Sequence, residues 1–240
     1  YALPPLDALL DPRSLRARLE CIEDRRAVLV EVQPRYLRLK PDVSALLGLE
    51  LTWQDALGCR RTRASLYLGE GAESAAVKAA TLRPLEPELG PALAAMDGAL
   101  YLAFPNDRVL RGLPAAADAR RLGNRLTRPG SPLGSRGVRV SARRSGVDVL
   151  RWKPGRRAVL RASLSLRGDD VGDGDCIRYV RVLPPMLLAA KLAGWTHASS
   201  LTGLAVPAIV DVDAERGILV TESVEGAPFL SHAAEHGTDR

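Results

Sequence analysis

The sequence predicts an α+β fold made of two related units, each an antiparallel sheet with a helix. Three observations carry this prediction. Extended segments outnumber helical ones in both halves of the 240-residue chain, a stretch near residue 40 recurs near residue 153, and a segment rich in proline, glycine and serine lies between the halves.

The first unit is predicted to span 1–127. Asp11 followed by Pro12 is typical of a helix start, and we expect this helix to end near Cys21. Pro105, Asn106 and Asp107 are predicted to end a strand and to cap a short helix through Arg111. Strands are predicted over 27–32, 36–40, 45–53, 63–68 and 99–104. Further helices are predicted over 72–82, 87–97 and 115–126.

Residues 128–137 are predicted to be a linker, because two prolines, three glycines and two serines in ten positions resist both helix and strand. The second unit is predicted over 138–240, with strands at 137–142, 147–152, 158–167 and 176–183. A helix over 184–201 should follow, and then a hairpin formed by 208–212 and 218–222.

The chain is basic, with 34 lysines and arginines against 28 acidic residues. Thirty of the basic residues are arginines, which fits a nucleic-acid or phosphate binder and equally an arginine-rich coding bias. The low aromatic content of 4% and the interleaved acidic residues argue against nucleic acid, although a basic nucleic-acid-associated protein stays a third alternative. No apolar run approaches the roughly 20 residues of a membrane helix, so we expect no membrane partner.

Three widely spaced cysteines, Cys21, Cys59 and Cys176, form no CxxC pair. We therefore expect free thiols, no metal site and a cytoplasmic protein. The chain begins at Tyr1 without a signal-peptide pattern, and no structural stop precedes Arg240, so we expect the natural polypeptide to continue.

An internal repeat gives the most informative pattern. With a shift of 113 residues, seven of the sixteen positions in 36–51 are identical to those in 149–164, including a shared Leu-Arg-x-Lys-Pro. The same shift places 64–68 on 177–181, so that Leu68 matches Arg181. Arginine and lysine two residues apart share one face of a strand, which is either a solvated basic face or, in one copy, a phosphate site.

The second unit resembles the small lobe of the aminoglycoside-phosphotransferase-like family, which has a protein-kinase-like fold. The resemblance covers about 138–230. It rests on 149–161, similar to the family's first hairpin, on 177–183, similar to its lysine strand, and on 206–210 with 217–226, similar to its last strands and hinge.

The resemblance implies an ATP site with Mg²⁺ ligands outside this chain. Adenine would contact the hinge near 221–226, at Glu222, Ser223 and Val224, and the phosphates would meet cations of the hairpin and third strand. These cations are Arg151, Lys153, Arg156, Arg157 and Arg181. Arg156 and Arg157 are equally consistent with solvated turn residues.

Several departures from the family pattern weaken the catalytic interpretation. Arg181 stands where a lysine is expected, no Glu or Asp in 184–201 can pair with it, and 154–157 is not a glycine-rich loop. No catalytic aspartate loop is found, so we expect no catalytic residue in this chain. The first unit is then interpreted as a degenerate lobe that packs against the second.

The leading hypothesis is the N-terminal part of an ATP-dependent phosphotransferase whose catalytic lobe lies beyond Arg240. The alternative is a pseudokinase-like nucleotide-binding or scaffolding module. These residues do not indicate which small molecule is the acceptor. Whether the chain forms a homodimer is left open.

Overall fold

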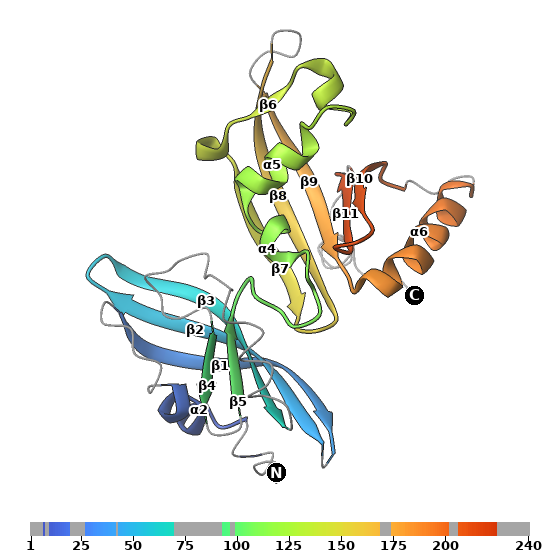
Figure 1. The fold of residues 1–240 in the computed structure, drawn as a ribbon. Coiled ribbons are helices and arrows are strands. Elements are labelled where there is room, and N and C mark those ends of the chain that lie inside the picture. The colour runs from blue at the N-terminus through green and yellow to red at the C-terminus, as the bar shows by residue number, and fades with distance from the viewer. Residues whose placement is uncertain are drawn as a thin grey trace, which may run out of the picture.

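The computed structural model describes residues 7, 10–19, 27–41, 43–69, 93–96, 99–168, 174–201 and 206–224. These residues form an α+β protein with two antiparallel sheets and a few helices, which confirms the α+β class that the sequence predicts (Figure 1). Within the described residues, no helix combines the length and the apolar character needed to cross a membrane.

The first sheet has the strand order β1-β2-β3-β5-β4. Its strands are β1 (Val28–Lys40), β2 (Ser44–Asp55), β3 (Gly58–Gly69), β4 (Leu93–Met96) and β5 (Ala99–Ala103). The two short strands predicted over 27–32 and 36–40 are one long strand, β1. Its register shifts between Leu29 and Glu31 and again between Pro34 and Tyr36, and such irregularities accommodate a proline in an edge strand.

Helix α2 (Pro12–Leu19) starts where the sequence predicts. The carboxylate of Asp11 caps it by accepting a hydrogen bond from the Ser14 amide at 2.9 Å. Leu15 and Leu19, 0% and 1% exposed, join the core on one face of the first sheet.

The sequence predicts a helix over 87–97, of which the structure describes 93–96, and there the prediction is wrong. Leu93–Met96 is strand β4, paired with β5 from Leu93 opposite Leu102 to Met96 opposite Ala99. An alanine-rich segment favours a helix locally, but the open edge of β5 supplies partners that override this preference. The helix predicted over 72–82 lies outside the described residues.

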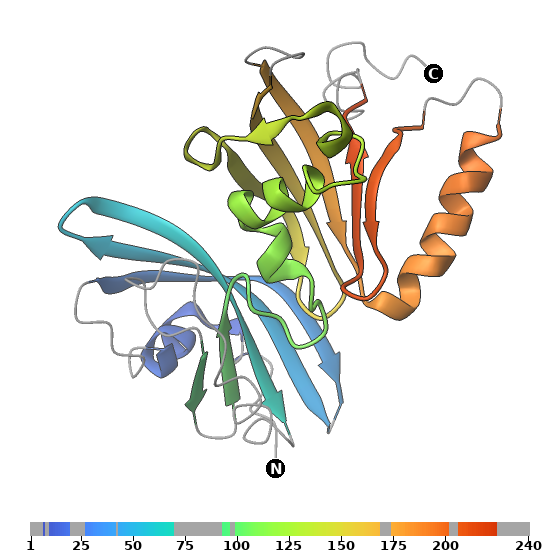
Figure 2. The same ribbon diagram turned by 45° about the horizontal axis from the view of Figure 1, so that its top comes forward.

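The second sheet is formed by β6 (Arg139–Val140), β7 (Gly146–Lys153), β8 (Arg157–Arg167), β9 (Gly174–Val182), β10 (Ile209–Asp213) and β11 (Ile218–Glu222). Its order is β10-β11-β9-β8-β6, and β7 also pairs with β8. Counted from β7, the order is first-second-third-fifth-fourth, the same as in the first sheet. Helix α6 (Pro185–Ser199) connects β9 to β10, and Figures 1 and 2 show it beside the β10–β11 hairpin.

The strand registers correct one detail of the repeat. Val159 pairs with Arg181, whereas the equivalent Leu46 pairs with Tyr67. Tyr67, and not Leu68, therefore occupies the position of Arg181. The offset between the units grows by one residue because the paired Val159 and Arg181 are 22 positions apart, whereas Leu46 and Tyr67 are 21 apart.

Helices α4 (Leu113–Ala116) and α5 (Ala119–Leu126) pack on the second sheet, as Figure 2 shows. We predicted them as part of the first unit and as one helix. The break occurs at Asp118, whose carboxylate caps α5 by accepting from the amides of Arg120 and Arg121 at 2.9 and 3.0 Å. The two cores thus divide between Ala103 and Leu110, before the segment 128–137.

The segment 128–137 is a hydrogen-bonded turn with a short 3₁₀ helix at Gly134–Arg136, although its composition predicts a linker. Ser131 is 6% exposed, its hydroxyl donates to the Leu126 carbonyl at 2.6 Å, and it accepts from the Gly134 amide at 3.0 Å. These bonds continue the packing of α5 onto the second sheet.

An ion-pair cluster fixes α5 to β10. Arg125 pairs with Asp211 and, at 2.6 Å, with Asp213, and all three side chains are 8–14% exposed. Arg125 also donates to the Val212 carbonyl at 2.9 Å. Because each buried charge has a partner, this cluster is structural.

Candidate functional site

The cations predicted to bind phosphate lie around the hairpin of β7 and β8. Arg151 and Lys153 are at the end of β7, Arg156 is in the turn, and Arg157 begins β8. Arg181 lies on β9, next to β8, opposite Val159. The antiparallel ladders therefore bring all five cations to one end of the second sheet.

The positive charges of this cluster affect one another. The pKa of Lys153 is lowered first by the charge of Arg151, then by desolvation and by Arg157 and Arg156. The pKa of Arg181 is lowered by burial and by the charge of Arg157. Both shifts disfavour the charged form, so an anion placed among these groups would relieve repulsion.

No ion pair within the described residues joins any of the five cations to a carboxylate. The Lys153 ammonium instead lies 5.8 Å from the centre of the Tyr36 ring. The cluster is therefore electrostatically unsatisfied, whereas Arg125 and Arg128 elsewhere in the molecule are paired with acids.

Arg181 contacts an aromatic ring where the family resemblance leads one to expect an acid. Its guanidinium carbon lies 4.6 Å from the centre of the Trp195 ring on α6. The Trp195 indole nitrogen donates to the Pro207 carbonyl at 3.0 Å, which fixes the ring before β10 begins. Our sequence reasoning missed Trp195, although it is the only aromatic residue in α6.

Helix α6 is otherwise weakly packed. Leu188 is buried, but Met186 and Leu187 are 85% and 52% exposed. The stacking of Trp195 on Arg181 is thus a main connection between α6 and the sheet.

The predicted hinge residues are at the other end of the same sheet region. Glu222 ends β11 opposite Arg178, three residues along β9 from Arg181, which corresponds to about 10 Å along a strand. Glu222, Ser223 and Val224 are exposed, and the Glu222 amide donates to the Ala208 carbonyl at 3.0 Å. Residues 225 and 226 of the predicted hinge lie outside the described residues.

The segment 104–112, here called the connector, joins β5 to α4, and its Asp107 carboxylate holds the β7–β8 turn in place. Asp107 Oδ2 accepts from the Gly155 amide at 2.8 Å and from the Trp152 indole nitrogen at 3.2 Å. Asp107 Oδ1 accepts from the amides of Val109 and Leu110, but these bonds close a turn; the short helix predicted through Arg111 is absent from the described residues 105–112, and α4 begins only at Leu113. The contacts of Asp107 to β7 and to the turn could not be read from the sequence because they span more than 40 residues.

Two further contacts join the first sheet to the hairpin. The guanidinium of Arg63 donates to the Val149 carbonyl at 2.7 Å, and the rings of Phe104 and Trp152 meet edge to face with their centres 5.3 Å apart. The first unit therefore supports the β7–β8 hairpin from one side.

Comparisons with known proteins identify no family for this chain. No family model matches the chain, and no curated protein and no solved structure matches it. Within the described residues, no group of three or more metal-ligating side chains is found. The chemistry of the site must therefore be argued from its own geometry.

Proposed function

We propose that this chain is the nucleotide-binding N-terminal part of an ATP-dependent phosphotransferase that acts on a small molecule. The observation that carries the proposal is the cation cluster of the β7–β8 hairpin and β9, which has no acidic partner among the described residues. This hairpin belongs to a six-stranded antiparallel sheet and, counted from β7, helix α6 enters between the third and fourth strands. That order is the one expected from the resemblance to the aminoglycoside-phosphotransferase-like family.

In this proposal the triphosphate of ATP lies against Arg151, Lys153, Arg156, Arg157 and Arg181. The adenine contacts the backbone at Glu222, Ser223 and Val224, about 10 Å away along the sheet. Phosphoryl transfer depends mainly on positioning and on neutralising charge. Five cations that lack acidic partners in the described part of the chain suit the second task. The Mg²⁺ ligands, the catalytic base and the acceptor site would come from outside the described residues.

The first unit fits the same proposal as a degenerate copy of the second. The two sheets share their strand order, and the hairpins share Leu-Arg-x-Lys-Pro. Tyr67 replaces Arg181, so the first copy lacks the third-strand cation. Its proposed role is to support the nucleotide-binding hairpin through Asp107 and Arg63.

A pseudokinase-like module is the second candidate, and the contact between Arg181 and Trp195 favours it. In this arrangement the third-strand cation is held by an aromatic ring instead of an acid on the helix. Such a module would bind nucleotide or serve as a scaffold without catalysis. Both candidate functions imply a cytoplasmic location, because Cys59 and Cys176 are free thiols and ATP is available in the cytoplasm.

Calorimetric titration of the chain with ATP and Mg²⁺ tests the proposal. We expect saturable binding that weakens at least about tenfold in Arg157→Gln and Arg181→Gln, since each removes a charged hydrogen-bond donor. Arg143→Gln is the matched control, because Arg143 is exposed in a short helix away from the hairpin. Absence of binding at millimolar ATP would favour a pure scaffold, and equal affinity in all three variants would refute the proposed position of the phosphates.

A further inference from the structure

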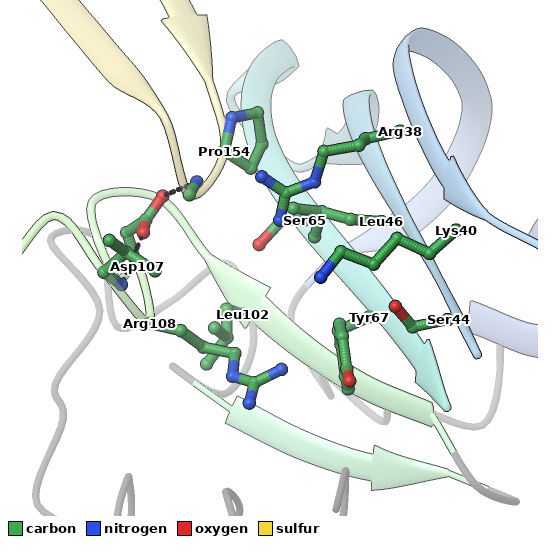
Figure 3. Close-up of a pocket in the computed structure, with 12 residues that line it drawn as sticks. Arg38, Lys40, Ser44, Leu46, Ser65, Tyr67, Leu102, Asp107, Arg108 and Pro154 are labelled. Atoms are coloured by element: carbon green, nitrogen blue, oxygen red, sulfur yellow. Dashed lines mark hydrogen bonds between the residues drawn. The ribbon is translucent and has the colours of Figure 1, made fainter. Parts of the chain in front are cut away.

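A second cationic site lies between the two units, on the first sheet. It is a cavity of about 280 Å³ whose walls come from β1, β2, β3 and β5, from the connector at 107–109 and from the β7–β8 turn. Figure 3 shows this cavity, with Pro154 of the turn on one side and the strands of the first sheet on the other. It shares the β7–β8 turn with the proposed ATP site but none of that site's cations, and the inference below does not rest on that proposal.

Three cations point into this cavity. Arg38 and Lys40 occupy alternate positions of β1 and so share one face of the strand. Arg108 approaches from the connector on the opposite side, with its guanidinium carbon 4.0 Å from the centre of the Tyr67 ring (Figure 3). Within the described part of the chain, no carboxylate forms an ion pair with any of the three.

Asp107 is the one acidic residue that lines the cavity, and its oxygens are already occupied. They accept hydrogen bonds from the amides of Val109, Leu110 and Gly155 and from the Trp152 indole nitrogen, at 2.8–3.2 Å. The lining therefore keeps an excess of two positive charges, with its carboxylate turned to the connector and to the turn.

Hydroxyl groups complete the lining. Ser44, Ser65 and Tyr67 come from β2 and β3 and face the same space as the cations. Hydroxyls donate hydrogen bonds, the arginine fork can donate two in parallel, and lysine supplies a compact charge. This donor set matches the several oxygens and the double negative charge of a phosphate group.

We propose that the cavity bounded by Arg38, Lys40 and Arg108 binds the phosphate group of a small molecule, or inorganic phosphate itself. Its volume lies at the lower end of the roughly 300–1,000 Å³ typical of ligand pockets, which favours a ligand no larger than a small phosphorylated metabolite. Pro154 and Gly155 of the β7–β8 turn form one wall of this cavity.

A second arginine-rich cavity, near Arg111 and Arg121, lacks this character. Three of its arginines, Arg125, Arg128 and Arg216, pair with Asp211 or Asp213. With Arg121 paired to Asp118, four of its five arginines have acidic partners, whereas none of the three cations of the first cavity has one among the described residues.

Titration of the whole chain with inorganic phosphate and with glycerol 3-phosphate, at constant ionic strength, tests the proposal. We expect saturable binding of at least one probe, weakened about tenfold in Arg38→Gln and in Lys40→Gln and unchanged in Arg143→Gln. Tighter binding of glycerol 3-phosphate would identify a phosphorylated metabolite as the ligand class. Equal or tighter binding of inorganic phosphate would identify the free anion.

Arg108→Gln provides a second variant that does not alter the sheet, because Arg108 is exposed on the connector. It should weaken phosphate binding like Arg38→Gln. The proposal is overturned if neither probe binds at millimolar concentration, or if Arg38→Gln and Arg108→Gln both keep wild-type affinity. It is also overturned if Arg157→Gln, and not Arg38→Gln, abolishes phosphate binding.

These measurements test the two proposals independently. ATP affinity should be unchanged in Arg38→Gln, and phosphate affinity should be unchanged in Arg157→Gln. Loss of one binding event therefore leaves the other intact.

Discussion

Tyr101 is the largest polar side chain in the core of the first unit. It lies on β5 opposite Leu66 of β3 and is 2% exposed. Burial raises the pKa of its phenol well above the ordinary value of 10.0. The folded chain therefore keeps this proton at pH values where the unfolded chain loses it.

This burial predicts a loss of stability at alkaline pH that Tyr101→Phe should reduce. The folded-state pKa is raised, so the stability is fully present below pH 10.0 and falls as pH rises above it. Relative to Tyr101→Phe, wild type should lose about 1.4 kcal/mol of unfolding free energy per pH unit above that value. Urea unfolding of both proteins from about pH 9 to about pH 11 measures the difference, and parallel losses in the two proteins would contradict the prediction.

Arg181 illustrates what the sequence reveals at the residue scale. Its strand was predictable because 176–183 is rich in β-branched and aromatic residues, and its place beside the hairpin cations followed from the family resemblance. Its partner Trp195 was not, since the contact crosses from a strand to the end of a helix. The one-residue shift that aligns Arg181 with Tyr67 also required the observed register.

At the scale of elements, Gly112 marks the closest approach between the connector and the second sheet. A Cβ atom at this position would lie 2.5 Å from the Arg216 carbonyl oxygen and 2.6 Å from Cγ1 of Ile218. The backbone at Gly112 has a φ of −81°, which any residue adopts, so the constraint is one of space.

Gly112→Ala should therefore destabilise the chain by about 1–3 kcal/mol, the usual range for an overpacked contact. Gly146→Ala is the matched control, because no atom lies within 4 Å of a Cβ added there. The control should be neutral or should stabilise by up to about 1 kcal/mol through the unfolded chain. Chemical denaturation compares the two, and equal effects would show that the connector does not pack as described.

The strands were more predictable than the helices. Alternating patterns identified all five strands from β7 to β11 to within a few residues. The helix over 115–126 was placed correctly but not divided at Asp118, because a cap inside a helical pattern looks like an ordinary polar residue. The alanine-rich segment before β5 was misread, since strand pairing depends on a neighbour that the local sequence does not show.

On the scale of the whole molecule, the boundary between the two cores was the main feature that composition misplaced. Proline, glycine and serine at 128–137 suggested a linker, yet α4 and α5 already pack on the second sheet. The connector at 104–112 instead joins the cores, and Asp107 fastens it to the β7–β8 turn. Long-range contacts such as these cannot be read from local patterns.

This arrangement also distributes charge between two separate sites. The cations of β7, β8 and β9 lie on the second sheet, and Arg38, Lys40 and Arg108 lie in the cavity on the first. Arginine abundance alone predicted neither site, because many other arginines pair with acids or stay exposed. The candidate residues were found from the repeat and the resemblance, and the cavity only from the fold.

Photolabelling with 8-azido-ATP tests the central claim most directly, because the reactive azide is carried by the adenine. The account predicts labelling of the segment around Glu222, Ser223 and Val224 that excess ATP prevents and that Arg157→Gln and Arg181→Gln reduce. Peptide mass spectrometry locates the label. Labelling that ATP does not prevent, or labelling confined to the first sheet at residues 28–103, would contradict the account.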